Sequence, residues 1–397
     1  MKVLFAAPYR DGTGYGQAAI QYILALDHVG VEVVPGLLKY NQRMADVPER
    51  ILELEERDIR NPDVVIQNTV PTCFDYNSKA GKNIGLFYTE TSNFKSQTDW
   101  VRLCNNMDQL WVASEDSVQH VMDSDVTVPT LSVPIPCDPA KYAKRYEPFP
   151  IPEVQEKFAF YFIAEYQRRK NLVTLLKAFH TEFHKREDVC LVLKVTVPGK
   201  SQKESLQEVI DCCTDVKREL GIYQRISDYH EEHIIADYLD EDEVMSLHST
   251  CDCFVMPSFA EGWCMPAFDA MAMGKVPICS DIGGIRDFLG HGCGTLIPVQ
   301  PEPVFGMSRW SQIPSLYTGT QRWWQCDIYE LRQQMRMMFE NKEAREQLAR
   351  NGIDRAYDFS YEIIGNKMKE ILDGQGKIGL LDWAAKKREK HYRTSMA

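Results

Sequence analysis

Short apolar runs alternate with amphipathic stretches through the first part of the chain, and a glycine-rich turn at residues 11–16 follows the first run. A helical pattern at residues 17–27 comes next. The apolar runs predict strands at residues 2–8, 31–35, 63–67, 83–88 and 109–113. Strands that alternate with helices in this way are typical of a doubly wound α/β domain built on a parallel sheet.

The same alternation begins again after a stretch dense in proline. Prolines cluster at residues 128–136 and 146–152, where they fix the backbone and end regular elements. The pattern then predicts strands at 158–164 and 189–195, helices at 172–185, 201–220, 327–340, 342–356 and 361–372, and a loop or insertion at 301–324. We therefore expect a Rossmann-like domain over residues 1–150, a second one over 151–372, and a basic tail at 373–397.

Composition narrows the classes of protein that fit this pattern. The chain has 397 residues, a length that suits two domains, and its net charge of −12 disfavours a surface built to neutralise nucleic-acid phosphates. No apolar run is long enough for a membrane span, and the twelve cysteines lack the spacing of a small disulfide scaffold. These features predict an unexported, cytoplasmic protein with reduced thiols.

The stretch from Pro257 to Gly284 carries the densest chemistry. An apolar strand at 253–256 leads into a Ser-x-x-Glu-Gly loop, and Pro266 is the expected first residue of a helix that ends at Gly274. The unpaired N–H groups and the positive dipole end of this helix face the loop, which makes an anion site. Glu261 and Asp269 flank that site with acceptors for hydroxyl groups, so we interpret it as a place for a sugar nucleotide.

A cluster of three cations stands in the other loop expected to meet a ligand. Arg168, Arg169 and Lys170 lie between the first strand and the first helix of the second domain. They are suited to neutralising a diphosphate and stabilising it as a leaving group. The alternative is a solvated helix start.

These motifs resemble the C-terminal half of the retaining glycosyltransferases of the GT-B fold, specifically family four. The resemblance rests on the Ser-x-x-Glu-Gly loop, the proline-started helix with a second acid, the Gly283–Gly284 loop and the Arg-Lys-Asn sequence ending at Asn171. It implies an α/β fold with two Rossmann-like domains facing across a cleft that holds a nucleotide-diphosphate sugar. It also implies that Glu261 binds sugar hydroxyls, and that Gly262, Trp263, Cys264 and Met265 offer N–H groups to the diphosphate. Lys170 matches the family's lysine, and the arginine role falls to Arg168 or Arg169.

Asp269 departs from the family pattern, which usually has glutamate at the second acid. The resemblance implies that Asp269 contacts the nucleotide ribose with a side chain one methylene shorter. The alternative is that Asp269 only stabilises the first turn of its own helix electrostatically.

The first domain offers weaker candidates. Gly14 and Gly16 lack the full dinucleotide-binding spacing, but in a GT-B chain they would let backbone amides approach the donor phosphates. Glu90 follows a strand and resembles a Glu-Thr motif of some relatives, so it is expected to bind or deprotonate the acceptor hydroxyl. A plain tight turn and a loop-fixing carboxylate are the respective alternatives.

The predicted function is retaining, metal-independent transfer of a sugar from a UDP- or GDP-sugar to a hydroxyl of a glycan, lipid or other acceptor. Glu261, Lys170, Arg169 and Glu90 are the predicted catalytic residues, and neither a cofactor nor a metal is expected, since no strand-borne Asp-x-Asp or closed His/Cys set is present. Two alternatives remain. One is a GT-B module that binds nucleotide or sugar without catalysis, and the other is a glycosyltransferase acting on modified DNA, which the acidic charge disfavours.

Overall fold

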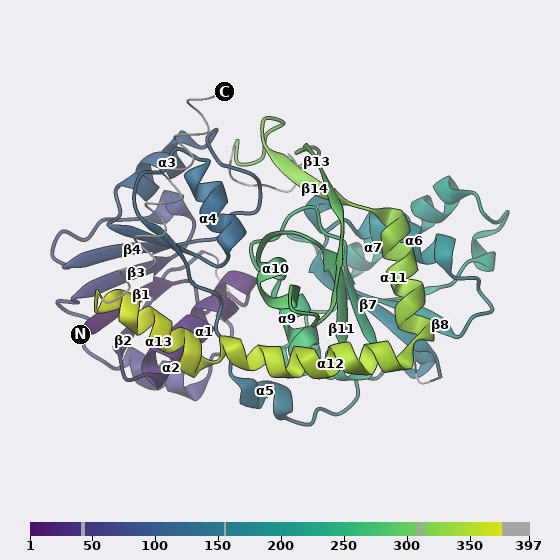
Figure 1. The fold of residues 1–397 in the computed structure, drawn as a ribbon, viewed down its shortest axis with the longest axis horizontal. Coiled ribbons are helices and arrows are strands. Elements are labelled where there is room, and N and C mark those ends of the chain that lie inside the picture. Colours follow the sequence, from purple (N-terminus) through teal and green to yellow (C-terminus); the bar gives the residue numbers. More distant parts are fainter. Residues whose placement is uncertain (41–43, 155, 308–310, 312, 314, 375–397) are drawn as a thin grey trace. The chain divides into compact units, whose positions relative to one another are not determined.

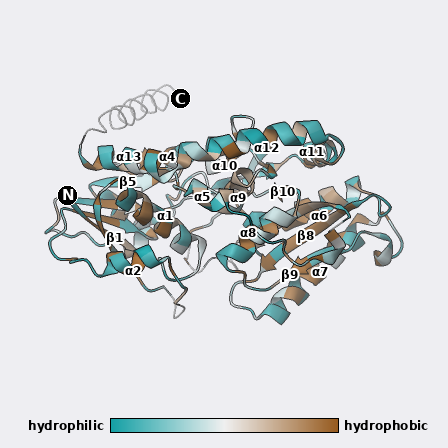
Figure 2. Ribbon diagram, turned by 90° about the horizontal axis from the view of Figure 1, so that it is seen from below, coloured by the Kyte–Doolittle hydropathy of each residue, from teal (hydrophilic) through white to brown (hydrophobic). Residues whose placement is uncertain are grey.

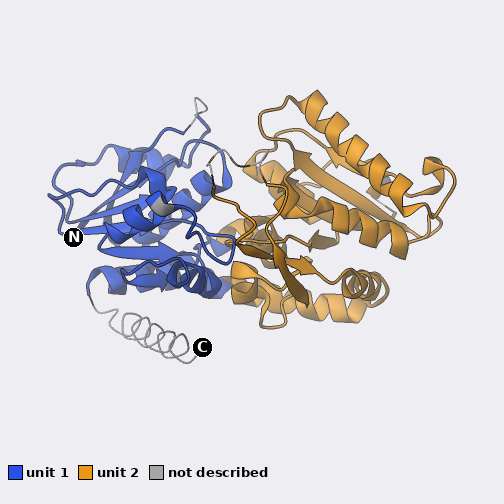
Figure 3. Cartoon of the chain, turned by 90° about the horizontal axis from the view of Figure 1, so that it is seen from above, with its two compact units in different colours: residues 1–139, 357–397 blue, residues 140–356 orange. Residues whose placement is uncertain are grey.

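The computed structural model describes residues 1–40, 44–154, 156–307, 311, 313 and 315–374. Two compact units divide the chain at Pro139 and again at Tyr357, so the second unit is Ala140–Ala356 and the chain from Tyr357 returns to the first (Figure 3). The sequence pattern instead placed a boundary at residue 150 and kept residues up to 372 in the second domain. Most of the predicted basic tail, 373–397, lies outside the described residues.

The first unit is a six-stranded parallel sheet in the order β2-β1-β3-β4-β5-β6 (Figure 1). Its strands are β1 Lys2–Ala7, β2 Glu32–Leu37, β3 Val64–Asn68, β4 Lys82–Leu86, β5 Gln109–Val112 and β6 Thr130–Ser132. Its helices are α1 Gly14–His28, α2 Glu49–Glu55, α3 Thr98–Asn105, α4 Glu115–Met122 and α13 Tyr361–Leu372. The chain reverses its direction of strand addition between β1 and β3, as a doubly wound sheet does.

Helix α13 belongs to the first unit because it packs closely on α1. A Cβ atom added at Gly365 would stand 2.5 Å from the carbonyl oxygen of Ala25, so only glycine lets the two helices approach this far. The Tyr361 hydroxyl also donates to Gln21 at 2.6 Å, and Lys369 Nζ donates to the Val29 carbonyl at 3.0 Å. A contact between segments so distant in sequence leaves no periodic signal, which is why the sequence pattern assigned this helix to the second domain.

The second unit repeats the architecture of the first. Its parallel sheet has the order β12-β11-β10-β7-β8-β9, and a separate antiparallel pair is formed by β13 and β14. The strands are β7 Phe158–Glu165, β8 Val189–Thr196, β9 Glu232–Ile235, β10 Cys253–Met256, β11 Val276–Ser280, β12 Thr295–Ile297, β13 Val299–Pro303 and β14 Arg322–Cys326. The helices are α5 Pro139–Ala143, at the junction of the units, then α6 Leu172–Glu182, α7 Gln202–Leu220, α8 Glu241–Thr250, α9 Met265–Ala272, α10 Gly283–Leu289, α11 Ile328–Glu340 and α12 Lys342–Ala356.

Hydropathy follows these layers. The central strands of both sheets are buried along most of their length, as expected for parallel strands covered on both faces. Figure 2 shows hydrophobic residues concentrated on the strands and on one side of the covering helices, whereas α12 carries hydrophilic residues along much of its length.

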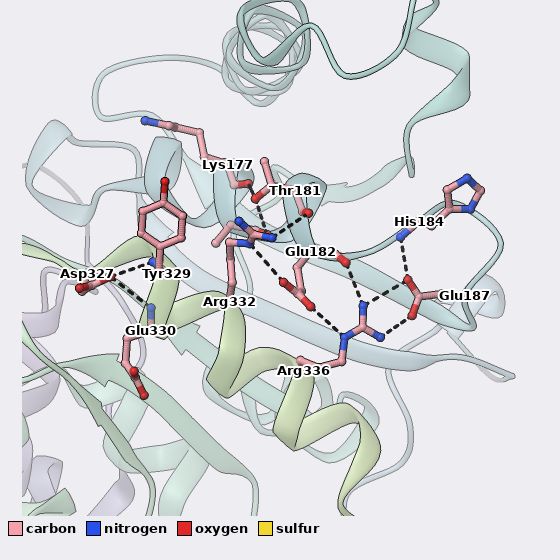
Figure 4. A network of polar contacts seen from close by, with 11 residues as sticks. Lys177, Thr181, Glu182, His184, Glu187, Asp327, Tyr329, Glu330, Arg332 and Arg336 are labelled. Atoms are coloured by element: carbon pink, nitrogen blue, oxygen red, sulfur yellow. Dashed lines mark hydrogen bonds and ion pairs between the residues drawn. The ribbon is translucent and has the colours of Figure 1, made fainter.

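An ionic network joins the end of α6 to α11 (Figure 4). Arg336 donates to Glu182 at 2.9 Å and pairs with Glu187, and its guanidinium lies 4.5 Å from the centre of the Phe183 ring. Arg332 adds a second contact to Glu182 at 3.1 Å. The network holds α11 against α6 (Figure 4).

The segment 301–324, expected to be a loop, begins and ends in paired strands. Strand β13 pairs antiparallel with β14, with Pro301 opposite Trp324 and Pro303 opposite Arg322. Proline is uncommon in strands, but a two-stranded ribbon has an outer edge where a missing N–H breaks no ladder bond. This part of the loop prediction was therefore wrong.

A hydrophobic cluster holds this hairpin against the rest of the second unit. It consists of Phe259, Ala260, Val304, Met307 and Trp323, with Tyr317 and Trp324 packed on it. The Trp323 ring stacks on the Phe259 ring at 4.3 Å between centroids and 14° between planes. The indole N–H of Trp323 donates to Glu302 at 2.9 Å, so the buried ring has no unsatisfied donor.

We expect Trp323→Ala to lower the free energy of unfolding by roughly 3–5 kcal/mol, the usual effect of truncating a large buried aromatic residue. Phe305→Ala on the same hairpin should change it by less than about 0.5 kcal/mol, because the Phe305 side chain is 72% exposed. Urea unfolding followed by circular dichroism measures both. Equal midpoints for the two variants would show that the cluster does not anchor the hairpin.

Candidate functional site

The carboxyl ends of β7 and β10 lie next to each other at the point where the second sheet reverses its direction of strand addition. Phe254 of β10 pairs with Tyr161 of β7, whereas β8 continues on the far side of β7. Ligands of open α/β sheets bind at such a switch point. The two loops that start here are the cation loop, Gln167–Asn171, and the acid loop, Pro257–Cys264.

Hydrogen bonds join the two loops along their length. The Phe259 amide donates to the Arg169 carbonyl at 2.8 Å, and Arg169 Nη1 donates back to the Ala260 carbonyl at 2.6 Å. Asn171 takes a left-handed conformation, and its side-chain Nδ2 donates to the Pro257 carbonyl at 2.9 Å. These hydrogen bonds therefore join the cation loop and the acid loop into one connected site. The sequence spacing alone does not indicate this.

Glu261 lies at the centre of these two joined loops. Its side chain is 4% exposed, and Lys170 Nζ donates to both of its carboxylate oxygens at 2.8 and 3.1 Å. Arg169 lies 3.2 Å from Oε2, and the Ser258 hydroxyl donates to Oε1 at 2.9 Å. Burial raises the pKa of this carboxyl, but the charges of Lys170 and Arg169 together with these hydrogen bonds more than offset it, so the pKa of Glu261 is below its ordinary value.

Arg168 is directed differently from its two neighbours. Its Nε donates to the Phe305 carbonyl of the hairpin at 3.0 Å, and its guanidinium lies 5.9 Å from the Phe259 ring centre and 5.6 Å from that of Phe305. The three cations that the sequence groups together thus separate into a buried pair on Glu261 and an exposed arginine beside the hairpin.

Helix α9 starts one residue earlier than expected, at Met265 with Pro266 in its first turn, and Gly274 follows its end at φ +71°. Its N-cap, Cys264, has φ +75° and gives no side-chain hydrogen bond to the helix start. Burial raises the pKa of the Cys264 thiol to about 12, and the charges of Glu261, Lys170 and Arg169 also act on it. A neutral thiol therefore lies at the positive end of the helix, close to the ionic cluster of Glu261, Lys170 and Arg169.

The Gly283–Gly284 turn presses directly on the acid loop. A Cβ atom at Gly283, where φ is +50°, would stand 1.8 Å from the Glu261 carbonyl oxygen. One at Gly284 would stand 2.6 Å from the carbonyl oxygen of Gly262. Both glycines are required by this close approach and not only by the turn.

Asp269 is bound by two residues that the sequence analysis missed. The Tyr142 hydroxyl donates to Asp269 Oδ1 at 2.7 Å, and Lys141 Nζ lies 3.5 Å from the same atom. Lys141 also pairs with Glu241 at 2.8 Å. Lys141 and Tyr142 stand in a proline-flanked segment without a motif, so only the fold reveals their partner.

In the first unit the structure groups the remaining candidates around the start of α1. Thr13 caps the helix, accepting from the Gly16 amide at 3.3 Å, and Asp11 accepts from the Thr13 amide at 2.8 Å. The helix begins at Gly14 and not at residue 17, because this cap makes the glycines part of the helix. Burial raises the pKa of Tyr15, and the charge of the half-buried Glu90 adds to that effect. Roles for Gly14, Gly16 and Glu90 stay predictions.

Among the residues that the structure describes, no group of three or more His, Cys, Asp or Glu side chains is arranged to hold a metal ion. None of the helices that the structure describes is long and apolar enough to cross a membrane.

The residues of the ionic cluster lie in a segment of the chain that matches a known protein family. Residues 144–303, which include the cation loop, the acid loop and Asp269, match the family described as Glycosyl transferases group 1. The match covers less than half of the chain and includes the residues around Glu261. The resemblance inferred from the motifs is thereby confirmed for this part of the chain.

Individual proteins that resemble this chain differ in how much of their length it covers. The serotype-specific mannosyltransferase WbdA of Escherichia coli is 25% identical over 131 residues, which are 32% of this chain but only 14% of that protein. HepE from Anabaena, solved in complex with UDP-glucose, shares 15% identity over 94% of this chain and 100% of that one, with a TM-score of 0.63. Sucrose-phosphate synthase from Thermosynechococcus elongatus gives a TM-score of 0.62 at 14% identity, over 95% of this chain and 100% of the other. The predicted GT-B class with two Rossmann-like α/β domains is confirmed.

Proposed function

We propose that this protein is a glycosyltransferase that moves a sugar from a nucleoside-diphosphate sugar to an acceptor hydroxyl, with retention at the anomeric carbon and without a metal ion. The observation that carries the proposal is the buried Glu261 carboxylate, ion-paired with Lys170 and Arg169 beside the start of α9. The family match and the solved HepE complex with UDP-glucose support a nucleotide-sugar donor.

Glu261 and its partners suggest how a donor would be received. A carboxylate offers about four acceptor positions, and Lys170, Arg169 and Ser258 together make four contacts with this one. Sugar hydroxyls can therefore bind Glu261 only if a present partner withdraws. Lys170 has a flexible stem and three donors, so we propose that its ammonium turns to the diphosphate and frees Glu261 for the sugar.

The leaving group would be held by the same cluster. In the proposed reaction the bond between the anomeric carbon and the diphosphate oxygen breaks, and negative charge develops on that oxygen. Lys170, Arg169 and the N–H groups at the start of α9 would stabilise that charge. The acceptor hydroxyl would attack from the face that the diphosphate leaves, and its proton would pass to a departing phosphate oxygen. Asp269, with Tyr142 on one oxygen, would accept from the ribose hydroxyls.

We expect UDP or GDP to raise the melting temperature of the protein, because a ligand that binds only the folded state stabilises it by mass action. UDP-glucose and GDP-mannose, incubated with glycan acceptors in the presence of EDTA, should then give a product whose anomeric configuration matches that of the donor by NMR. Scanning fluorimetry and product NMR are the two measurements.

Each part of the proposal has its own contrary result. Nucleotide binding without turnover of any donor favours a binding module that lacks catalysis. An inverted product would contradict retention, and loss of turnover with EDTA, restored by Mg²⁺ or Mn²⁺, would contradict metal independence. Failure of both UDP and GDP to bind would remove the proposal.

A further inference from the structure

The outer end of the β13–β14 hairpin places an aromatic ring and a cation side by side at the surface. Phe305 follows β13, and its side chain is 72% exposed. The exposed Arg168 guanidinium lies against its ring at 5.6 Å and donates from Nε to the Phe305 carbonyl. Both residues belong to the second unit, and Arg168 directly precedes the buried pair of cations on Glu261.

The position of Arg168 is set by its surroundings. Its guanidinium is near both the Phe259 and Phe305 rings, and a Cβ atom at Gly306, where φ is +77°, would stand 2.6 Å from Arg168 Cδ. The Phe305 carbonyl accepts a hydrogen bond from Nε of Arg168. The N–H groups of its two terminal nitrogens can therefore donate to a ligand. No carboxylate in the described part of the chain pairs with Arg168, in contrast to Arg169 and Lys170.

We propose that Arg168 and Phe305 form a subsite for an anionic group carried on a sugar ring of the acceptor. A planar guanidinium binds phosphate or carboxylate through two parallel hydrogen bonds, and the apolar face of a sugar packs on an exposed aromatic ring. Neither residue contacts Glu261, so the subsite is separate from the carboxylate that is proposed to bind the donor sugar. The role of the bound sugar as an acceptor rests on the proposed glycosyl transfer. Binding of the anionic sugar itself does not require turnover.

The test uses the full chain and four probes: glucose 6-phosphate, glucuronate, glucose and inorganic phosphate, each titrated by calorimetry. We expect glucose 6-phosphate or glucuronate to bind at least about tenfold more tightly than glucose or phosphate alone, since two contacts act together. Glucose 6-phosphate binding alone identifies a phosphate-bearing acceptor, and glucuronate binding alone identifies a carboxylate-bearing one.

Variants separate the subsite from general charge and from the donor site. Phe305→Ala and Arg168→Gln should each weaken the anionic sugar about tenfold, whereas Phe305→Trp should retain its binding. Arg225→Gln, which removes an exposed arginine paired with Asp228, is the matched control and should change nothing. UDP binding should be the same in Phe305→Ala and in the wild type.

Three results overturn the subsite: failure of both anionic sugars to bind, glucose or inorganic phosphate binding as tightly as both of them, or UDP affinity falling with Phe305→Ala. None depends on the proposed function, which fails separately. If the anionic sugar binds at Arg168 and Phe305 while UDP and GDP do not bind, the subsite stands and the glycosyltransferase proposal is lost. If UDP binds and no anionic sugar does, the reverse holds.

Discussion

Glu261→Gln is expected to abolish sugar transfer while leaving UDP binding intact or tighter. Glutamine has nearly the same shape as glutamate, but it leaves Lys170 and Arg169 without their counter-charge and so more available to a diphosphate. The sugar, in contrast, loses an ionised acceptor for its hydroxyls. Misplacement of the reacting centre by about 1 Å costs on the order of 100-fold, so turnover of UDP-glucose or GDP-mannose should fall by at least that factor.

The same substitution should destabilise the fold in a pH-dependent way. Breaking a buried ion pair costs roughly 3–5 kcal/mol, and the partial exposure of Lys170 reduces the expected loss to about 2–3 kcal/mol. Because the pKa of Glu261 is lowered in the folded state, its stabilisation is complete above the unfolded pKa and is lost as pH falls through the folded value. The difference in unfolding free energy between wild type and variant should therefore shrink below about pH 4.3.

Glu232→Gln provides the control for these two effects. Glu232 is 5% exposed and pairs with Lys217 and His180 in the same unit, away from the acid loop. Its pKa is also lowered: burial raises it, but His180 and Lys217 more than offset that effect. This variant should lose stability but keep both UDP binding and turnover. If Glu232→Gln and Glu261→Gln reduce turnover equally, Glu261 is a structural residue only.

The hydrophobic pattern predicted most of the regular elements, because the helices repeat apolar residues at helical spacing and the central strands of the sheets are continuous apolar runs. The predicted helices at 342–356 and 361–372 match α12 and α13. Local rules failed where tertiary contacts decide: α13 packs on α1 through Gly365, and β13 and β14 pair despite two prolines.

The candidate site shows the same division. The motif identified Glu261 and the cations, since residue types in the loops at the switch point carry chemical meaning. It did not indicate that Arg168 turns away from Arg169 and Lys170, because side-chain direction in a short loop depends on the hairpin that it meets. Nor did it indicate Tyr142, which contacts Asp269 from 127 residues away.

Replacing Gly283 is also expected to have a large effect on turnover and stability, because there is no space for a Cβ atom at this position. An added Cβ atom would lie 1.8 Å from the Glu261 carbonyl oxygen, a distance that real Cβ atoms do not show. The acid loop must therefore move when Gly283 is replaced. Since Glu261 is held by three partners from both loops, a displaced carbonyl displaces the carboxylate with it.

We expect Gly283→Ala to lose UDP-glucose or GDP-mannose turnover by about 100-fold or more, and to unfold at least about 2–3 kcal/mol more easily than its control. The control is Gly30→Ala in the first unit, where φ is +77° and nothing lies within 4 Å of the added carbon. It measures the strain of a left-handed alanine alone, roughly 1–2 kcal/mol, and should leave turnover unchanged. Urea unfolding and steady-state kinetics on both variants compare the two effects. Similar losses of stability and turnover in both would mean that the acid loop tolerates the added carbon, and that the close approach of Gly283 to Glu261 does not hold the carboxylate in place.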